Sequence, residues 1–337
     1  MPKLPEDPLA TVDALRQITS VVAPANAGTV GQYVECQRRS GKPAYVSQTG
    51  TEAWITGARW QLRRTPVFAT SEPAPHEVRR LLREQGIWLV SYALQPDAQR
   101  PANAFCYQCR AAEYGMETLP SKSRNMVRKG FRNVQVRLCS WDELLEEGYA
   151  AYLDTDVRHG YNAPSRVVFE EQVGRCREAS FFDVYGAWHK NKLVSWLTVA
   201  KVNDWADEQE FRSTTEHLTL GANNAVRYAA LRHLLVVEKY QRVTSGASGH
   251  QVRAQEELWL HRNKISMGFE AKLIHRHYAI HPAVRPFICS KSAAWLWDKV
   301  AILFPRSYVL PRLVALSRFI SGRADPLAWS QGGSTSA

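Results

Sequence analysis

The chain has 337 residues, of which 45% are hydrophobic and 22% are charged, and its formal net charge is +11. This length predicts two domains, and the composition excludes an intrinsically disordered protein, because such chains lack the apolar residues needed for a core. The excess of basic residues favours partners that carry phosphate groups, such as a nucleic acid, an anionic lipid or coenzyme A.

The distribution of cysteines and apolar residues excludes two further classes. Six cysteines are spread thinly over the chain, which is not the pattern of a disulfide-stapled secreted domain. No uncharged apolar run reaches the roughly 20 residues that span a bilayer. The first ten residues contain three prolines and two acids, so we expect no signal peptide and a cytoplasmic protein.

The first half of the chain is expected to begin after an N-terminal extension at residues 1–28. Apolar periodicity and the position of Gly86 predict five elements in it. They are a strand at residues 66–70, a helix at 76–85, a strand at 87–94, a basic helix at 121–131 and a strand at 134–138.

The second half is expected to begin with a helix. Ser140 and Glu143 have the spacing of a capping box, which predicts a helix running to about Asp154. Later elements are a hairpin at 181–188 and 193–201, a strand at 211–220, a helix capped by Asn223 or Asn224 and running to about residue 240, a strand at 243–247, a helix at 252–267 and a strand at 269–280.

Both halves end in the order helix, strand, helix, strand, which indicates a duplication. Mixed strands and helices in this order predict an α/β fold in which helices cover a sheet. We therefore expect a first domain at 29–140, a second at 141–290, a C-terminal packing segment at 291–324 and a disordered tail at 325–337.

A basic cluster occupies the helix predicted at 121–131 and the residue after it. Arg124, Arg128 and Arg132 follow one another at intervals of four, Lys129 lies among them, and no acid occurs between Ser121 and Trp141. Like charges on one helix face repel unless an anion lies between them. The cluster is therefore interpreted either as a phosphate or substrate site or as a solvated basic face.

Three motifs carry a resemblance to a known group of proteins. SRNMVRKG at 123–130, followed by VQV at 134–136, resembles the R-N-I-R-K-A … V-x-V segment of FemAB-like aminoacyltransferases and related GNAT proteins. HLTLGANNAVRY at 217–228, VTSG at 243–246 and MGF at 267–269 resemble the acceptor strand, helix and turns of that group. The resemblance covers residues 60–285 and implies tandem GNAT-like (acyl-CoA N-acyltransferase) domains, with mixed sheets flanked by helices.

The resemblance also implies a place for the acyl donor. The loop before the helix would hold the phosphates of acyl-CoA at a helix N-terminus, as GNAT enzymes do. The pattern usual for acetyl-CoA is missing, so the donor is acyl-CoA or, as in FemAB-like relatives, aminoacyl-tRNA. An ordinary capped helix is the alternative interpretation. The cofactor-binding candidates are Gly221, Ala222, Asn223, Asn224, Arg227, Ser245 and Gly246.

Candidate catalytic residues lie on the strand predicted at 211–220. Glu216 and His217 are adjacent, so on a strand they would point to opposite faces of the sheet. One of them could take the proton that an amine acceptor loses, and Glu216 is favoured. A paired surface acid is the alternative. His250, after a turn of small residues, is a candidate for binding the substrate.

No metal site is predicted. Cys106 and Cys109 have the spacing of zinc ligands, but no second pair follows at the usual distance. His275 and His277 would share a strand face, for which a half-buried strand edge is the simpler explanation. The sequence thus predicts an N-acyltransferase acting on an amine of a small molecule, sugar or peptide. The alternatives are a nucleic-acid-binding module, with tRNA as one partner, and a noncatalytic GNAT-like protein of glycan or lipid assembly.

Overall fold

The computed structural model describes residues 27–58, 60–84, 86–110, 112–161, 165–249, 254–290, 292, 295–297, 299–300, 310–320 and 327. The predicted N-terminal extension, except for its last two residues, lies outside this part of the chain. So do His250 and nearly all of the tail predicted at 325–337. The described residues form two compact units, each assembled from separate stretches of the chain.

The first unit contains the described residues up to Ser40, together with Gln108–Ser245 and Lys264–Glu270. Its helices and strands are α2 (Val30–Arg39), η2 (Met116–Thr118), α4 (Ser121–Asn133), β6 (Gln135–Leu138), α5 (Trp141–Arg158), α6 (Arg166–Arg177), β7 (Phe182–His189), β8 (Lys192–Val202), β9 (Trp205–Ser213), η3 (Thr215–Leu220), α7 (Ala222–Arg232), the π-helix η4 (His233–Val237) and most of β10 (Arg242–Ala247).

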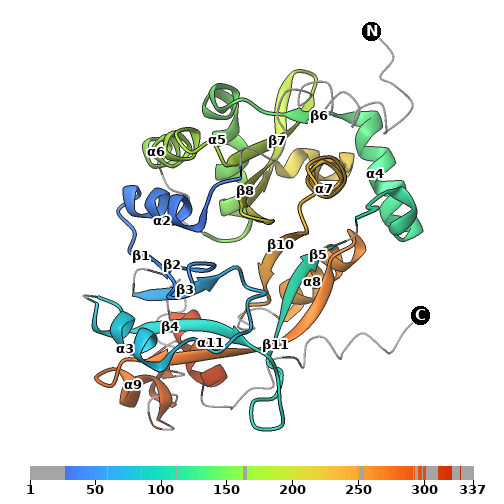
Figure 1. The fold of residues 1–337 in the computed structure, drawn as a ribbon. Helices are drawn as coiled ribbons and strands as arrows, with labels where there is room; N and C mark the ends of the chain where they lie inside the picture. The colour runs from blue at the N-terminus through green and yellow to red at the C-terminus, as the bar shows by residue number, and fades with distance from the viewer. Residues whose placement is uncertain are drawn as a thin grey trace. The chain divides into compact units, whose positions relative to one another are not determined.

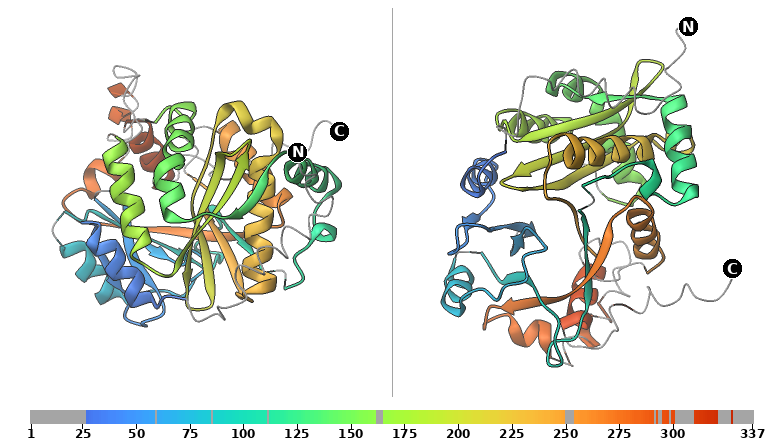
Figure 2. Two further views of the ribbon diagram at one scale, coloured as in Figure 1. Left: turned by 90° about the horizontal axis from the view of Figure 1, so that it is seen from above. Right: turned by 45° about the vertical axis from the view of Figure 1, so that its right-hand side comes forward.

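A mixed sheet organises this unit, in the strand order β10-β9-β8-β7-β6. Strands β6 to β9 pair antiparallel, whereas β9 and β10 pair parallel. The β7–β8 hairpin turns at Lys190 and Asn191, both at positive φ, a conformation that matches the twist of a two-residue hairpin. Helices α5 and α6 lie on one face of the sheet and α7 on the other (Figure 1; Figure 2, left).

The strands β7 and β8 are buried almost throughout, because helices cover both of their faces. The core between this sheet and helices α5 and α6 is aromatic. Phe169 packs against Tyr152 and Trp196, with ring centroids 5.4 and 6.4 Å away. Trp196 Nε1 donates to the carbonyl of Gly148 at 3.0 Å, so the polar atom of this buried ring has a partner.

The second unit contains Gly41–Tyr107, Gly246–Asn263 and the described residues from Ala271 onward. Its strands pair in the order β1-β2-β3-β4-β11 around a core that includes Trp54, Leu62 and Leu81. The elements are β1 (Ala44–Val46), β2 (Ala53–Ala58), β3 (Gln61–Thr65), α3 (Pro75–Arg83), β4 (Leu89–Leu94), most of β5 (Ala104–Cys109), most of α8 (Ala254–Ser266), β11 (Glu270–Ile280), α9 (Arg285–Cys289) and α11 (Leu310–Ile320).

Most predicted elements are confirmed, including the basic helix, the helix capped by Ser140 and the β7–β8 hairpin. The strand predicted at 66–70 is wrong, because β3 ends at Thr65 and a loop follows. The buried guanidinium of Arg64 donates to the carbonyls of Ala69 and Ser71 at 2.6 and 2.7 Å, which wraps this loop around the side chain.

The two compact units do not coincide with the division predicted at residues 140 and 141. Strand pairing joins distant parts of the chain: β11 pairs with β4, about 180 residues earlier, so both belong to the second unit. The boundaries of a tandem repeat therefore stay a prediction.

No helix among the described residues is long and apolar enough to span a membrane. None of the six cysteines, all of which are among the described residues, is in a disulfide.

Candidate functional site

The parallel strands β9 and β10 stay paired over only three positions, from Trp205 and Arg242 to Asp207 and Thr244. Immediately beyond them β9 carries a bulge, because Glu208 and Glu210 face consecutive residues of β8 and Gln209 is the extra residue. A bulge re-aims the side chains that follow it. Here it places Phe211 on the same side of β9 as Glu208, which precedes the bulge, and both lie against the side chain of Arg227 of α7.

A buried ion pair lies where the two strands separate. Arg227 Nε and Nη2 donate to the two carboxylate oxygens of Glu208, each at 3.0 Å, and the side chains are 9% and 6% exposed. Ser245 Oγ of β10 donates to Glu208 Oε2 at 2.7 Å. The guanidinium also stacks over Phe211, 4.7 Å from the ring centroid. One carboxylate thus links β9, β10 and α7.

A second cation reaches the same point from the end of α8. Lys264 Nζ donates to the carbonyl oxygen of Ser245 at 2.6 Å. The ring of Phe269, which follows on the chain, lies 5.9 Å from the Arg227 guanidinium. Tyr114 donates its hydroxyl to the carbonyl of Met267 at 2.8 Å, and burial raises the pKa of this tyrosine well above its usual value, so it remains a neutral donor.

The α7 N-terminus lies under the backbone of α4. Gly221 is the N-cap and has φ +80°, and both Gly221 and Ala222 are buried. A Cβ on Gly130 of α4 would lie 2.4 Å from the carbonyl oxygen of Gly221, so the two helices touch through their backbones. The prediction that Asn223 or Asn224 caps this helix is wrong, since the N-cap is the left-handed Gly221, two residues before Asn223.

The two asparagines instead tie the first turn of α7 to its surroundings. Asn223 accepts from Ser195 Oγ at 2.9 Å and donates to Ser213 Oγ at 3.2 Å. Asn224 donates to the sulfur of Met267 at 3.4 Å. Their cofactor-binding role stays a prediction, as do those of Gly221, Ala222, Arg227, Ser245 and Gly246; Gly246 belongs to the second compact unit.

Glu216 and His217 are not on a strand, so the prediction that they point to opposite faces of a sheet is wrong. Strand β9 ends at Ser213, and η3, a 3₁₀-helix, follows. The carboxylate of Asp154 accepts the N–H of Thr215 at 2.8 Å, which fixes the start of this helix. Glu216 is exposed there, whereas His217 is half-buried, with Nδ1 2.9 Å from Thr214 Oγ1.

The basic cluster forms the outer face of α4. Arg128, Lys129 and Arg132 are exposed and Arg124 is half-buried. None of the four side chains forms an ion pair with a described residue, whereas the inner face packs Val127 and Phe131 into the core. Their binding role, like that of His250 outside the described residues, stays a prediction.

The structure therefore brings Arg227 and Ser245 together with two residues that the sequence analysis missed, Glu208 and Lys264. Glu208 lies in an acidic run, Asp207-Glu-Gln-Glu210, which resembles a solvated strand edge. What distinguishes Glu208 from the neighbouring acids is its ion pair with Arg227 of α7, a long-range contact that the local sequence does not reveal. Nothing in the local sequence marks Lys264 as a functional residue, because its neighbours are residues that commonly occur in helices.

Neither protein-family models nor curated protein sequences give a match to this chain. Solved structures do. FemX aligns over 77% of this chain and 94% of its own, with a TM-score of 0.54 and 9% identity. The C-terminal DUF2156 domain of a candidate lysylphosphatidylglycerol synthetase from Agrobacterium fabrum aligns over 88% and 98%, with a TM-score of 0.51 and 12% identity. The chain thus has the GNAT- and FemAB-like α/β fold, a mixed sheet flanked by helices, that its sequence motifs predicted.

Proposed function

We propose that this protein transfers an acyl or aminoacyl group to an amine at the point where β9 and β10 separate. The observation that carries the proposal is the buried Arg227–Glu208–Ser245 arrangement at the end of a three-residue parallel pairing. The likeness of the fold to FemX and to the synthetase domain supports it. The acceptor would be an amine on a small molecule, sugar or peptide.

The chemistry follows from the groups at this point. An amine nitrogen attacks the acyl carbonyl carbon, and negative charge develops on the carbonyl oxygen. The intermediate then collapses to the amide, breaking the thioester C–S bond of acyl-CoA or the ester C–O bond of aminoacyl-tRNA, and the thiol or the tRNA hydroxyl leaves with a proton. Lys264, held against the carbonyl of Ser245, supplies a positive charge beside that oxygen. The ion pair of Arg227 and Glu208 keeps the strand ends in fixed positions, so positioning contributes much of the rate. Glu216 and His217 remain the proposed acceptors of the amine proton.

Both candidate donors, acyl-CoA and aminoacyl-tRNA, carry phosphates. Because α4 covers Gly221 and Ala222, we assign the phosphates to the outer face of α4, where Arg124, Arg128, Lys129 and Arg132 have no ion-pair partner among the described residues. Coenzyme A, acetyl-CoA and tRNA can be compared directly by thermal shift, since only a ligand of the folded state raises the melting temperature.

Transfer itself is tested with labelled acyl-CoA and aminoacyl-tRNA against a panel of primary amines. Lys264→Met should lower kcat by about 10²–10³-fold if the ammonium stabilises the oxyanion, while donor affinity is kept. Lys192→Met, at the exposed β7–β8 turn, is the matched control and should leave turnover unchanged. No transfer from either donor by the wild-type protein would contradict the proposal.

A second candidate function is binding of a nucleic acid without catalysis. It is favoured by the basic face of α4, whose arginines and lysine have no ion pair with a residue that the structure describes, and which bears no exposed large apolar residue. Binding of RNA that depends steeply on salt, together with the absence of transfer, would favour this function over the first.

A further inference from the structure

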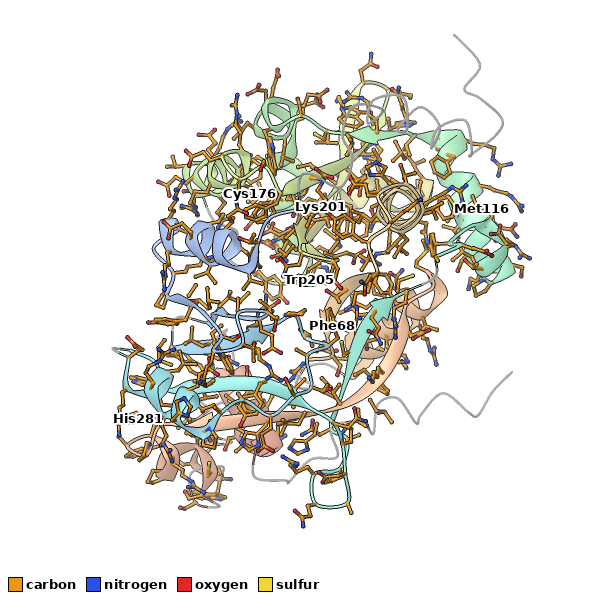
Figure 3. All side chains as sticks on the ribbon, in the orientation of Figure 1. Phe68, Met116, Cys176, Lys201, Trp205 and His281 are labelled. Carbon is orange, nitrogen blue, oxygen red and sulfur yellow. The ribbon has the colours of Figure 1, made fainter. Side chains whose placement is uncertain are left out.

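A cluster of five polar side chains lies inside the first unit, on residues that the proposed transfer does not use. Asp183 and Tyr185 lie two positions apart on β7, so they share a face, and Lys201 comes from the end of β8 (labelled in Figure 3). His233 is the first residue of the π-helix η4, and Glu238 is the residue that follows it. The N–H of Glu238 donates to the carbonyl of His233 at 2.9 Å, and this wide turn places both side chains beside the strands.

The carboxylates of this cluster share one cation. Lys201 Nζ lies 2.8 Å from Asp183 Oδ2 and 3.3 Å from Glu238 Oε1, and its side chain is 5% exposed. His233 is fully buried, and burial lowers its pKa to about 4, so its ring is neutral at pH 7. Two carboxylates that share one ammonium in a buried place are costly to keep charged together, and burial raises the pKa of Glu238 above its usual value.

Two buried atoms of the cluster have no hydrogen-bond partner among the described residues. They are His233 Nε2 and Glu238 Oε2. Buried polar atoms are almost always paired, so two of them in one cluster require an explanation. One donor atom from each of Asp183, His233 and Glu238 lies within 4.8 Å of the others. The arrangement therefore offers three converging ligands, two of which have a buried atom without a partner among the described residues.

From this geometry we infer that Asp183, His233 and Glu238 bind a divalent transition-metal ion of the zinc type. One imidazole and two carboxylates suit Zn²⁺ better than Mg²⁺ or Ca²⁺, which prefer oxygen ligands alone. Bonds of about 2.0–2.2 Å would draw the three ligand atoms closer together than they now lie. The site is separate from Arg227 and Lys264, so it goes beyond the proposed transfer.

Two neighbours fit this assignment. Tyr185 OH lies 2.7 Å from His233 Nδ1, and a partner on the second ring nitrogen is what orients a metal-bound histidine. The ammonium of Lys201 is a second positive charge beside the proposed metal ion, because it contacts the carboxylates of both Asp183 and Glu238. Its charge opposes the metal without occupying His233 Nε2 or Glu238 Oε2. Loss of that charge should therefore tighten metal binding, whereas loss of a ligand should weaken it.

The experiment uses the untagged full-length chain, stripped with a chelator and titrated with Zn²⁺, Co²⁺, Mg²⁺ and Ca²⁺. We expect Zn²⁺ at one equivalent to raise the melting temperature, Co²⁺ to give a visible d–d spectrum, and Mg²⁺ and Ca²⁺ to do neither. No Zn²⁺-dependent shift in the wild-type protein overturns the inference. His76→Gln, which removes an exposed histidine on α3, is the control for surface binding and should bind Zn²⁺ like the wild type.

Some variants are expected to weaken Zn²⁺ binding and one is expected to tighten it, so the test does not depend on a general loss of stability. Glu238→Gln and His233→Gln should abolish the Zn²⁺ response, and Tyr185→Phe should weaken affinity by about 10- to 100-fold. Lys201→Gln should tighten Zn²⁺ binding by at least about tenfold, because it removes a charge near the ion. A purely structural ion cluster would lose stability in all four variants and gain affinity in none. Weaker Zn²⁺ binding by folded Lys201→Gln would therefore overturn the assignment.

Discussion

The side chains of Arg227 and Glu208 meet through two hydrogen bonds of 3.0 Å, and both are more than nine-tenths buried. This pair joins α7 to β9 immediately before the extra residue of the bulge, Gln209. Ser245 adds a third hydrogen bond, so the carboxylate also fixes β10. The position of the candidate site therefore depends on a charge pair whose partners lie 19 residues apart in the sequence.

Breaking this pair should destabilise the protein strongly. Arg227→Met and Glu208→Gln are each expected to lower the free energy of unfolding by about 3–5 kcal/mol, because each leaves the other charge buried alone. The double variant should lose less than the sum of the two. Urea denaturation of the four proteins gives the coupling energy. Strict additivity would mean that the two residues do not act as a pair.

The close contact between α4 and α7 should tolerate no side chain. Gly130→Ala places a Cβ 2.4 Å from the carbonyl oxygen of Gly221, a backbone atom that cannot move alone. We expect a loss of about 1–3 kcal/mol by thermal or chemical denaturation. Gly174→Ala in α6 is the matched control: its Cβ meets nothing within 4 Å, so it should gain up to about 1 kcal/mol from helix propensity. Equal changes in stability for Gly130→Ala and Gly174→Ala would contradict the importance of the close contact between α4 and α7.

Acid stability should depend on the capping box of α5. The hydrogen bonds from Arg137 lower the pKa of Glu143 to about 2, with further help from Ser140. A carboxyl with a lowered folded-state pKa stabilises the protein above its unfolded-state value, near 4.5, and that contribution disappears as the pH falls from 4.5 to 2. Glu143→Gln should be less stable than wild type at pH 7.

The difference in stability between Glu143→Gln and wild type should shrink across that same pH window. Denaturant titrations at pH 7, 5, 4 and 3 measure it. A difference that stays constant with pH would show that the carboxylate charge has no part in the effect.

The outer face of α4 should bind the anionic donor. Arg128→Glu with Arg132→Glu is expected to weaken binding of coenzyme A or tRNA and to reduce its salt dependence. The matched control is Arg79→Glu with Arg83→Glu, an exposed i,i+4 pair on α3 that changes the net charge equally. Equal losses of affinity in both double variants would show that binding depends on the overall charge of the protein and not on the position of these arginines. Binding isotherms at several salt concentrations distinguish the two outcomes.

Proton transfer is tested at η3. Glu216→Gln keeps the shape of the side chain and removes its basicity, so turnover should fall while donor affinity is spared. His217→Gln tests the half-buried neighbour, whose Nδ1 already contacts Thr214. Wild-type kinetics in Glu216→Gln would refute its role as a base and leave the assignment of the fold unaffected. The pH dependence of kcat in both variants would then identify which residue titrates.

Local sequence signals determined the elements that depend on neighbouring residues. The helix starting after Ser140, the turn of the β7–β8 hairpin and the basic helix α4 were predicted because capping, turn conformation and apolar periodicity act within a few residues. The motifs at residues 123–130 and 217–228 likewise indicated the FemAB-like fold.

Tertiary structure alone decided the rest. The strand expected at 211–220 stops at Ser213 because Asp154, about 60 residues earlier, takes the N–H of Thr215. Glu208 pairs with Arg227 of α7, the bulge formed by pairing with β8 brings Phe211 to the same guanidinium, and Lys264 reaches Ser245 from another helix. A single sequence carries periodicity and propensity, but it does not carry register or long-range hydrogen bonds, and those interactions assembled the candidate site.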